Sequence, residues 1–253
     1  MLKFGLDFIS KPSRAVNAIK KDPRKALKAA TGVYAVYLIT AALFYTLKPD
    51  GFPPPIPGAE ATAVEHGLLF WIGVQAWSPV LLAVWIAATG WFCGLLGTGK
   101  LAVRMPAALG SIIIPILLFV VYKNGSIPRS AFAATWLILI AVMIPGFRRI
   151  KKDDWIRLTA SLAGLHAAAI LLLLPFTLAV LARSPRAYHA VELVMLFWVL
   201  GLASYSVRRV MEIATARAFS AVFLSLVAQI LFVFSMYLLG ILPKGVLKAL
   251  MAA

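Results

Sequence analysis

Long apolar runs, separated by short basic segments, dominate the chain from residue 29 onwards. Seven such runs are apparent, at residues 29–47, 67–96, 105–122, 130–144, 158–181, 190–205 and 218–242. Continuous apolar runs are typical of membrane-spanning helices, whereas a membrane β-barrel needs short strands of alternating polarity. The pattern therefore predicts an all-α fold, a polytopic transmembrane helical bundle with six to seven spans.

Two of these runs leave alternatives open. The run 130–144 is short: at about 1.5 Å per residue it covers ~22 Å of a ~30 Å hydrocarbon core, and Pro145 follows it. Together with 105–122, which contains Pro115, it forms either two full crossings or a shallow hairpin. The run 67–96 is too long for one straight span, and Ser78-Pro79 predicts a kink or the point of membrane entry.

The residues before the first run form a separate basic segment. Residues 1–28 contain eight Lys and Arg, and we expect a cytoplasmic, basic, amphipathic arm there, followed by a transmembrane domain over residues 29–253. Pro12 predicts the start of a short helix with Val16 and Ile19 on one apolar face. Asp22 as N-cap and Pro23 at the first helical position predict a helix that continues into the first span. Such an arm either lies on the anionic inner leaflet or only sets the orientation of the chain.

Charge distribution predicts the topology. The chain carries 25 Lys and Arg against nine Asp and Glu, a net charge of +16, yet it is 62% hydrophobic. With seven crossings, 18 of the 25 cations lie on the side of the N-terminus and seven on the other side. The positive-inside rule then places the N-terminus in the cytoplasm and the C-terminus outside. Basic topology loops account for the charge, so nucleic-acid binding is not expected.

The same features indicate where the chain is found. The long basic region before the first span lacks a small-residue cleavage site, so we expect a retained signal-anchor and not a cleaved signal peptide. The single cysteine, Cys93, lies within an apolar run and excludes both a disulfide framework and a cysteine-based metal site. We expect an integral protein of a bacterial or archaeal cytoplasmic membrane.

Residue patterns for catalysis or cofactor binding are weak. The segment 94–101, GLLGTGKL, is close to a phosphate-binding loop, but Leu101 replaces the required Ser or Thr and the segment follows a membrane span. His166 and Glu192 are ionisable groups in or near spans, and ordinary hydrogen bonding or ion pairing explains both. Neither HExxH nor GxSxG with partner residues occurs. We therefore expect no cofactor, no metal and no enzymatic activity.

The layout of the chain resembles the Yip family, the Ypt/Rab-interacting membrane proteins, in its prokaryotic form. The similar features are the Ile9-Ser-Lys-Pro12 segment, the apolar positions Val16 and Ile19, the Lys20-Lys-Asp-Pro23 step, and an aromatic helix, a basic turn and an Ala-rich helix at the end. Family members commonly have five spans, so the run 130–144 is an expected addition. The resemblance implies a non-enzymatic helical membrane protein that acts through partners or lipids.

We therefore expect a Yip-like scaffold or accessory subunit of a membrane assembly, with a small-solute or lipid transporter as the alternative. Its expected partners are anionic inner-leaflet lipids and either other proteins or further copies of itself. Lipid or partner docking is expected at Pro12, Lys20, Lys21, Asp22, Pro23, Arg24, Lys25, Arg148, Arg149, Lys151, Lys152 and Arg157.

Overall fold

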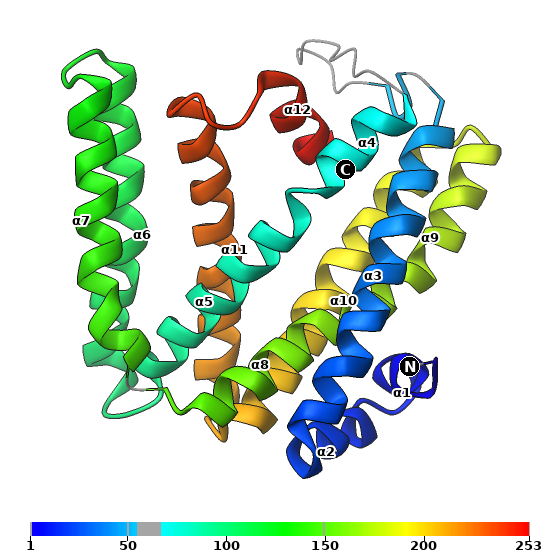
Figure 1. Cartoon of the computed structure of the whole chain (residues 1–253), viewed down its shortest axis with the longest axis horizontal. Helices are drawn as coiled ribbons and strands as arrows, with labels where there is room; N and C mark the ends of the chain where they lie inside the picture. Colours follow the sequence, from blue (N-terminus) through cyan, green and yellow to red (C-terminus); the bar gives the residue numbers. More distant parts are fainter. Residues whose placement is uncertain (1, 50, 55–66, 149, 253) are drawn as a thin grey trace.

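The chain forms a bundle of long helices, seen in a computed structural model that describes residues 2–49, 51–54, 67–148 and 150–252 (Figure 1). No strand occurs among these residues. The helices are α1 (Leu2–Ser10), α2 (Pro12–Lys21), α3 (Pro23–Leu47), α4 (Leu68–Gln75), α5 (Ser78–Leu96), α6 (Leu101–Lys123), α7 (Arg129–Arg148), α8 (Lys152–Gly164), α9 (His166–Leu181), α10 (Pro185–Met211), α11 (Thr215–Leu238) and α12 (Lys244–Ala252).

Seven helical segments of the described chain are long and apolar enough to cross a membrane, which confirms the polytopic helical bundle. Five are single helices, and α4–α5 and α8–α9 each make one further span. At about 1.5 Å per residue, the 20 residues of α7 reach ~30 Å, the thickness of the hydrocarbon core. The helix is longer than the apolar run because it begins at Arg129 and continues past Pro145 to Arg148.

Two spans are interrupted. The helix from Leu68 stops at Gln75 and resumes at Ser78, where Pro79 occupies a first-turn position, so the span is interrupted at the Ser78-Pro79 step. A second interruption, which the apolar pattern did not indicate, separates α8 from α9 at Leu165.

Helix packing divides the bundle into a dense body and a peripheral hairpin. In the body, α3 packs along α8, α5 packs along α11, and α10 contacts α8, α9 and α11. The hairpin of α6 and α7 stands at one edge (Figure 1), and α7 is the least buried of the spans. We call the end that carries α1 and α2 the basic end, and the end with the α6–α7 turn the far end.

Candidate functional site: the basic end of the bundle

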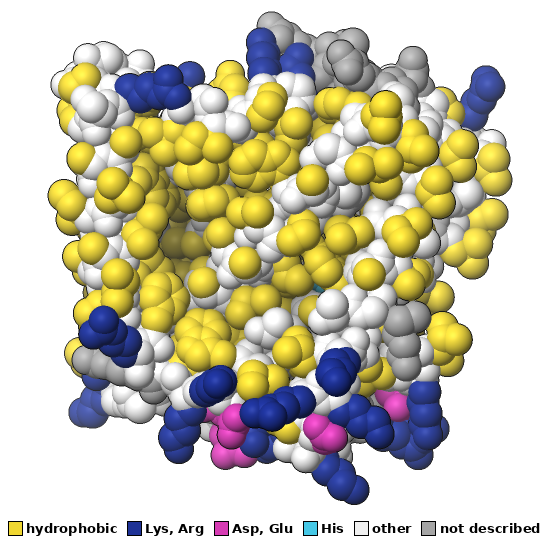
Figure 2. Space-filling view, viewed as in Figure 1, with side chains coloured by type: hydrophobic (Ala, Val, Ile, Leu, Met, Phe, Trp, Pro, Cys, Tyr) yellow, Lys and Arg dark blue, Asp and Glu magenta, His cyan; other side chains and the backbone are white. Residues whose placement is uncertain are grey.

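Most of the cations gather at the basic end. The segments that meet there hold 18 Lys and Arg and five Asp and Glu, and Figure 2 shows dark blue side chains along the lower edge of the molecule with a few acidic groups between them. Between the two edges the visible surface is mainly hydrophobic. This separation is what a bilayer requires of a protein that crosses it.

The basic arm is packed against the bundle. Val16 and Ile19 of α2 are buried and belong to the same hydrophobic cluster as Leu158 of α8 and Val207 of α10. The predicted apolar face of α2 therefore exists, but it faces protein. Leu2 and Leu6 of α1, in contrast, are exposed.

The first helix is held by a close contact with the interruption between α8 and α9. The ring of Phe8 is fully buried, and a Cβ at Gly164 would lie 2.5 Å from it. A side chain at position 164 would thus displace Phe8. Small residues allow membrane helices to pack closely, and Gly164 allows the close approach of Phe8 here.

An ion pair links the arm to the turn between α10 and α11. Lys20 Nζ donates to Glu212 Oε1 at 2.6 Å. The hydrogen bond from Lys20, and then its charge, lower the pKa of Glu212, and the charge of Arg157 acts in the same direction. The ion-pair partner of Glu212 therefore comes from a segment 192 residues away in the chain and not from Arg208, four residues before it. The pair is solvent-exposed, so its value lies in positioning more than in stability.

Asp22 and Pro23 start the third helix as predicted. Asp22 Oδ1 accepts a hydrogen bond from the backbone N–H of Lys25 at 3.0 Å, and Pro23 occupies the first helical position. The helix then runs 25 residues without a break into the first span. Pro12 has the same first-turn position in α2. These three candidate docking residues therefore have structural roles, whereas Lys21, Arg24 and Lys25 are exposed.

The second predicted docking segment is divided by the structure. Arg157 Nη1 donates to Asp154 Oδ1 at 3.3 Å and is half-buried on α8, near Glu212. Arg148, Lys151 and Lys152 are exposed around the α7–α8 connection, which lies across the basic end from α2 (Figure 1). Arg149 lies outside the described residues. The structure thus pairs Lys20 with Glu212 and Arg157 with Asp154, and it leaves Arg148, Lys151 and Lys152 exposed.

Arg217 is a structural residue that we had counted only as a basic loop residue. Its guanidinium donates from Nη1 to the carbonyl of Leu96 at 2.9 Å and from Nη2 to the carbonyl of Gly99 at 2.6 Å. The Leu96 carbonyl is at the end of α5, where backbone acceptors lack helical partners, and the Gly99 carbonyl is in the turn that leads to α6. The segment that resembled a phosphate-binding loop therefore presents carbonyls to a cation, and it follows a span as expected. A pairing of residues 118 or more apart has no local sequence signal.

The ionisable residues flagged within or near the spans all have partners. His166 Nδ1 lies 3.1 Å from the carbonyl of Ala163, and its ring packs against Tyr34 and Tyr37. Glu192 Oε2 lies 2.7 Å from His189 Nδ1. No group of three His, Cys, Asp or Glu residues that would hold a metal occurs in the part of the chain that the structure describes.

Comparison with known proteins adds no relative: no protein-family model, curated protein or solved structure matches this chain.

Proposed function

We propose that this integral membrane protein is a non-enzymatic scaffold or accessory subunit of a membrane assembly, as its resemblance to the Yip family implies, and that its basic end is the docking surface. The observation that carries the proposal is the fixed position of the basic arm. Phe8, Val16 and Ile19 anchor the arm in the hydrophobic core, and Lys20 links it to the α10–α11 turn.

A fixed arm supports a docking role because the cost of ordering it has been met before a partner binds. A flexible tail would serve as a topology signal equally well, since the positive-inside rule counts charges and needs no structure. Here Lys21, Arg24 and Lys25 project from helix ends whose opposite faces are buried. A surface of this kind suits an acidic patch on a partner protein.

The experiment is purification of the full chain in a mild detergent, followed by mass spectrometry of what co-purifies. We expect a stoichiometric protein partner that is lost in the variant K21E/R24E. The matched control is R183E/R186E, which reverses two exposed charges at the far end, one in the α9–α10 turn and one in the first turn of α10. Retention of the partner in K21E/R24E, or recovery of the chain only as an isolated oligomer, would refute docking at the basic end.

A transporter is the second candidate, and the two interrupted spans favour it. Discontinuous membrane helices often border substrate sites in transporters. The α4–α5 interruption adjoins an apolar cavity of about 430 Å³ lined in part by Leu38, Ile72 and Gln75. An isolated oligomer that moves a solute across proteoliposomes, at a rate lowered by Gln75→Leu, would support transport in place of the scaffold.

A further inference from the structure

A cavity at the far end, between the α6–α7 hairpin and α11, has a composition unlike that of its surroundings. Its volume is about 610 Å³, within the usual range for small-molecule sites. It is lined by Tyr122, Lys123, Gly125, Ile127, Arg129, Tyr237 and Leu238. Two of these residues are cations, and none of the described lining residues is acidic.

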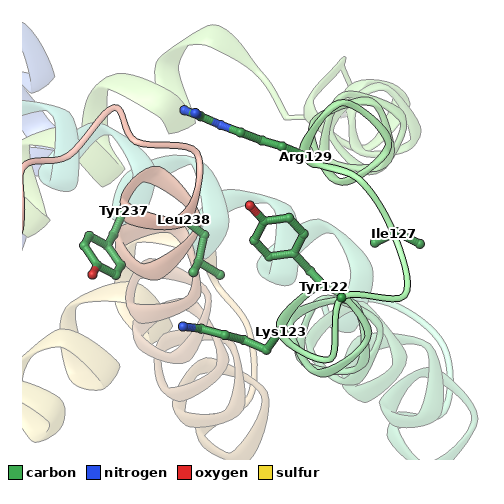
Figure 3. Close-up of a pocket in the computed structure, with 7 residues that line it drawn as sticks. Tyr122, Lys123, Ile127, Arg129, Tyr237 and Leu238 are labelled. Atoms are coloured by element: carbon green, nitrogen blue, oxygen red, sulfur yellow. The ribbon is translucent and has the colours of Figure 1, made fainter.

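Both cations of the cavity extend from the hairpin, one on each side of Tyr122. Lys123 is the last residue of α6 and Arg129 is the first residue of α7. Figure 3 shows both side chains extending from the hairpin toward α11, with the ring of Tyr122 between them and Ile127 turned away. The Tyr122 ring stacks on the buried Phe132 ring at a centroid distance of 4.5 Å, so its position is held by packing.

Helix electrostatics explain one of these cations and not the other. A cation at a helix C-terminus, such as Lys123, is favourable, but a cation at a helix N-terminus, such as Arg129, opposes the helix dipole. The Arg129 guanidinium extends over the backbone turn after α11, where the ideal Cβ position of Gly240 lies only 2.6 Å from Nη2. An anion in the cavity would offset the unfavourable placement and pair with both cations.

The surface below the cations is apolar. Figure 2 shows a hollow between the α6–α7 hairpin and α11, bordered by hydrophobic side chains, with Lys or Arg side chains across its upper edge. Val120 and Val121, which precede Tyr122 on α6, are exposed large hydrophobics. A cationic opening above an apolar hollow matches a molecule with an anionic head and hydrocarbon tails.

We propose that this cavity, together with the apolar hollow below it, binds one anionic phospholipid of the leaflet at the far end. Lys123 and Arg129 pair with the headgroup from the two sides of Tyr122, the Tyr122 hydroxyl donates to a headgroup oxygen, and the acyl chains fill the hollow between α6–α7 and α11. Basic pockets between membrane helices on the cytoplasmic side bind anionic lipid headgroups, and the same pairing of charges is available to a basic pocket at the opposite end. The lipid fills a gap beside the least buried span and connects the hairpin to the body of the bundle.

The test is native mass spectrometry of the detergent-purified full chain, titrated with dioleoylphosphatidylglycerol and, separately, with zwitterionic dioleoylphosphatidylcholine. We expect one phosphatidylglycerol to bind more tightly than phosphatidylcholine. The variant K123Q/R129Q should weaken the phosphatidylglycerol Kd at least about tenfold, because charge-assisted hydrogen bonds contribute about 1.5–3 kcal/mol and 1.4 kcal/mol is a factor of ten. The charge-conserving variant K123R/R129K should stay within about threefold of the wild type.

The control R183Q/R186Q removes two exposed cations at the same end of the bundle and should leave the affinity unchanged. Equal weakening in K123Q/R129Q and R183Q/R186Q would show general attraction to the charged surface and overturn the site. Equal binding of the two lipids would also overturn it. Millimolar glycerol 1-phosphate should not displace the lipid; full displacement would assign a free phosphate-ester site and refute the lipid.

Discussion

Replacing Phe8 by Ala tests whether the basic arm is an ordered part of the bundle. The Phe8 side chain is fully buried against Gly164, and glycine has no side chain of its own to fill the space that Ala would leave. Core Phe→Ala substitutions cost about 3–5 kcal/mol, because transfer and cavity terms add. We expect the loss to appear as local opening of α1 and α2, while the spans remain folded.

The magnitude sets what the assay should detect. At 1.4 kcal/mol per factor of ten, a loss of about 3 kcal/mol raises the open population roughly 100-fold. Hydrogen–deuterium exchange of the protein in lipid nanodiscs should therefore accelerate by about this factor in peptides covering residues 2–21, with little change in α5 or α11. Trypsin should also cleave faster after Lys20 and Lys21.

The matched control is Leu6→Ala, in the same helix, since the Leu6 side chain is 64% exposed. It should change exchange by less than about threefold. Equal acceleration by Leu6→Ala and Phe8→Ala, or none by either, would refute the inference that Phe8 anchors the arm.

Four further experiments probe the polar contacts, the topology and the absence of an active site. Arg217→Met removes the donor to the Leu96 carbonyl at the end of α5 and to the Gly99 carbonyl in the α5–α6 turn. It should lower stability by about 1–3 kcal/mol, measured as a lower Tm in detergent; an unchanged Tm would contradict this role. Lys20 lowers the pKa of Glu212, so the stabilisation from this ion pair is fully present above the ordinary carboxyl pKa of 4.5 and is lost as the pH falls through the lowered pKa. Hydrogen exchange in α2, corrected for intrinsic rates, should therefore rise in the wild type over this pH range. In Glu212→Gln it should not respond to the same change of pH. A C-terminal reporter should be active only outside the cytoplasm, and cytoplasmic activity would reverse the predicted topology. Finally, His166→Ala combined with Glu192→Ala should leave partner binding intact, whereas loss of function in a folded double variant would favour an enzyme.

Local signals in the sequence predicted much of the fold. Apolar length is a property of each segment alone, so all seven spans could be located without knowing their neighbours. Helix starts are similarly local: Asp22 and Pro23 satisfy or remove backbone donors within one turn, and the helix begins where they predicted. The end of α7 was placed too early because Pro145 was expected to stop the helix, and instead the helix continues to Arg148.

The candidate site was only partly accessible from sequence. The cations at the basic end were found because their number and spacing predict a topology. Their partners could not be predicted from the sequence, because the contacts span long separations in the chain. Lys20 pairs with Glu212, and Arg217 donates to the backbone carbonyl at the end of α5. The cavity between Lys123 and Arg129 was also missed, because two cations flanking a turn have an ordinary topological explanation until α11 is placed opposite them.

The sequence by itself determined that this is a helical membrane protein with a basic segment before its first span, because apolar length, capping and charge bias act over one or a few turns. Only the tertiary structure decided that the basic arm is packed into the bundle, through contacts of Phe8, Val16 and Ile19. An amphipathic helix has the same pattern whether its apolar face meets lipid or protein, since both remove that face from water. The choice depends on the shape of the opposing surface, and here Gly164 provides the space that Phe8 fills.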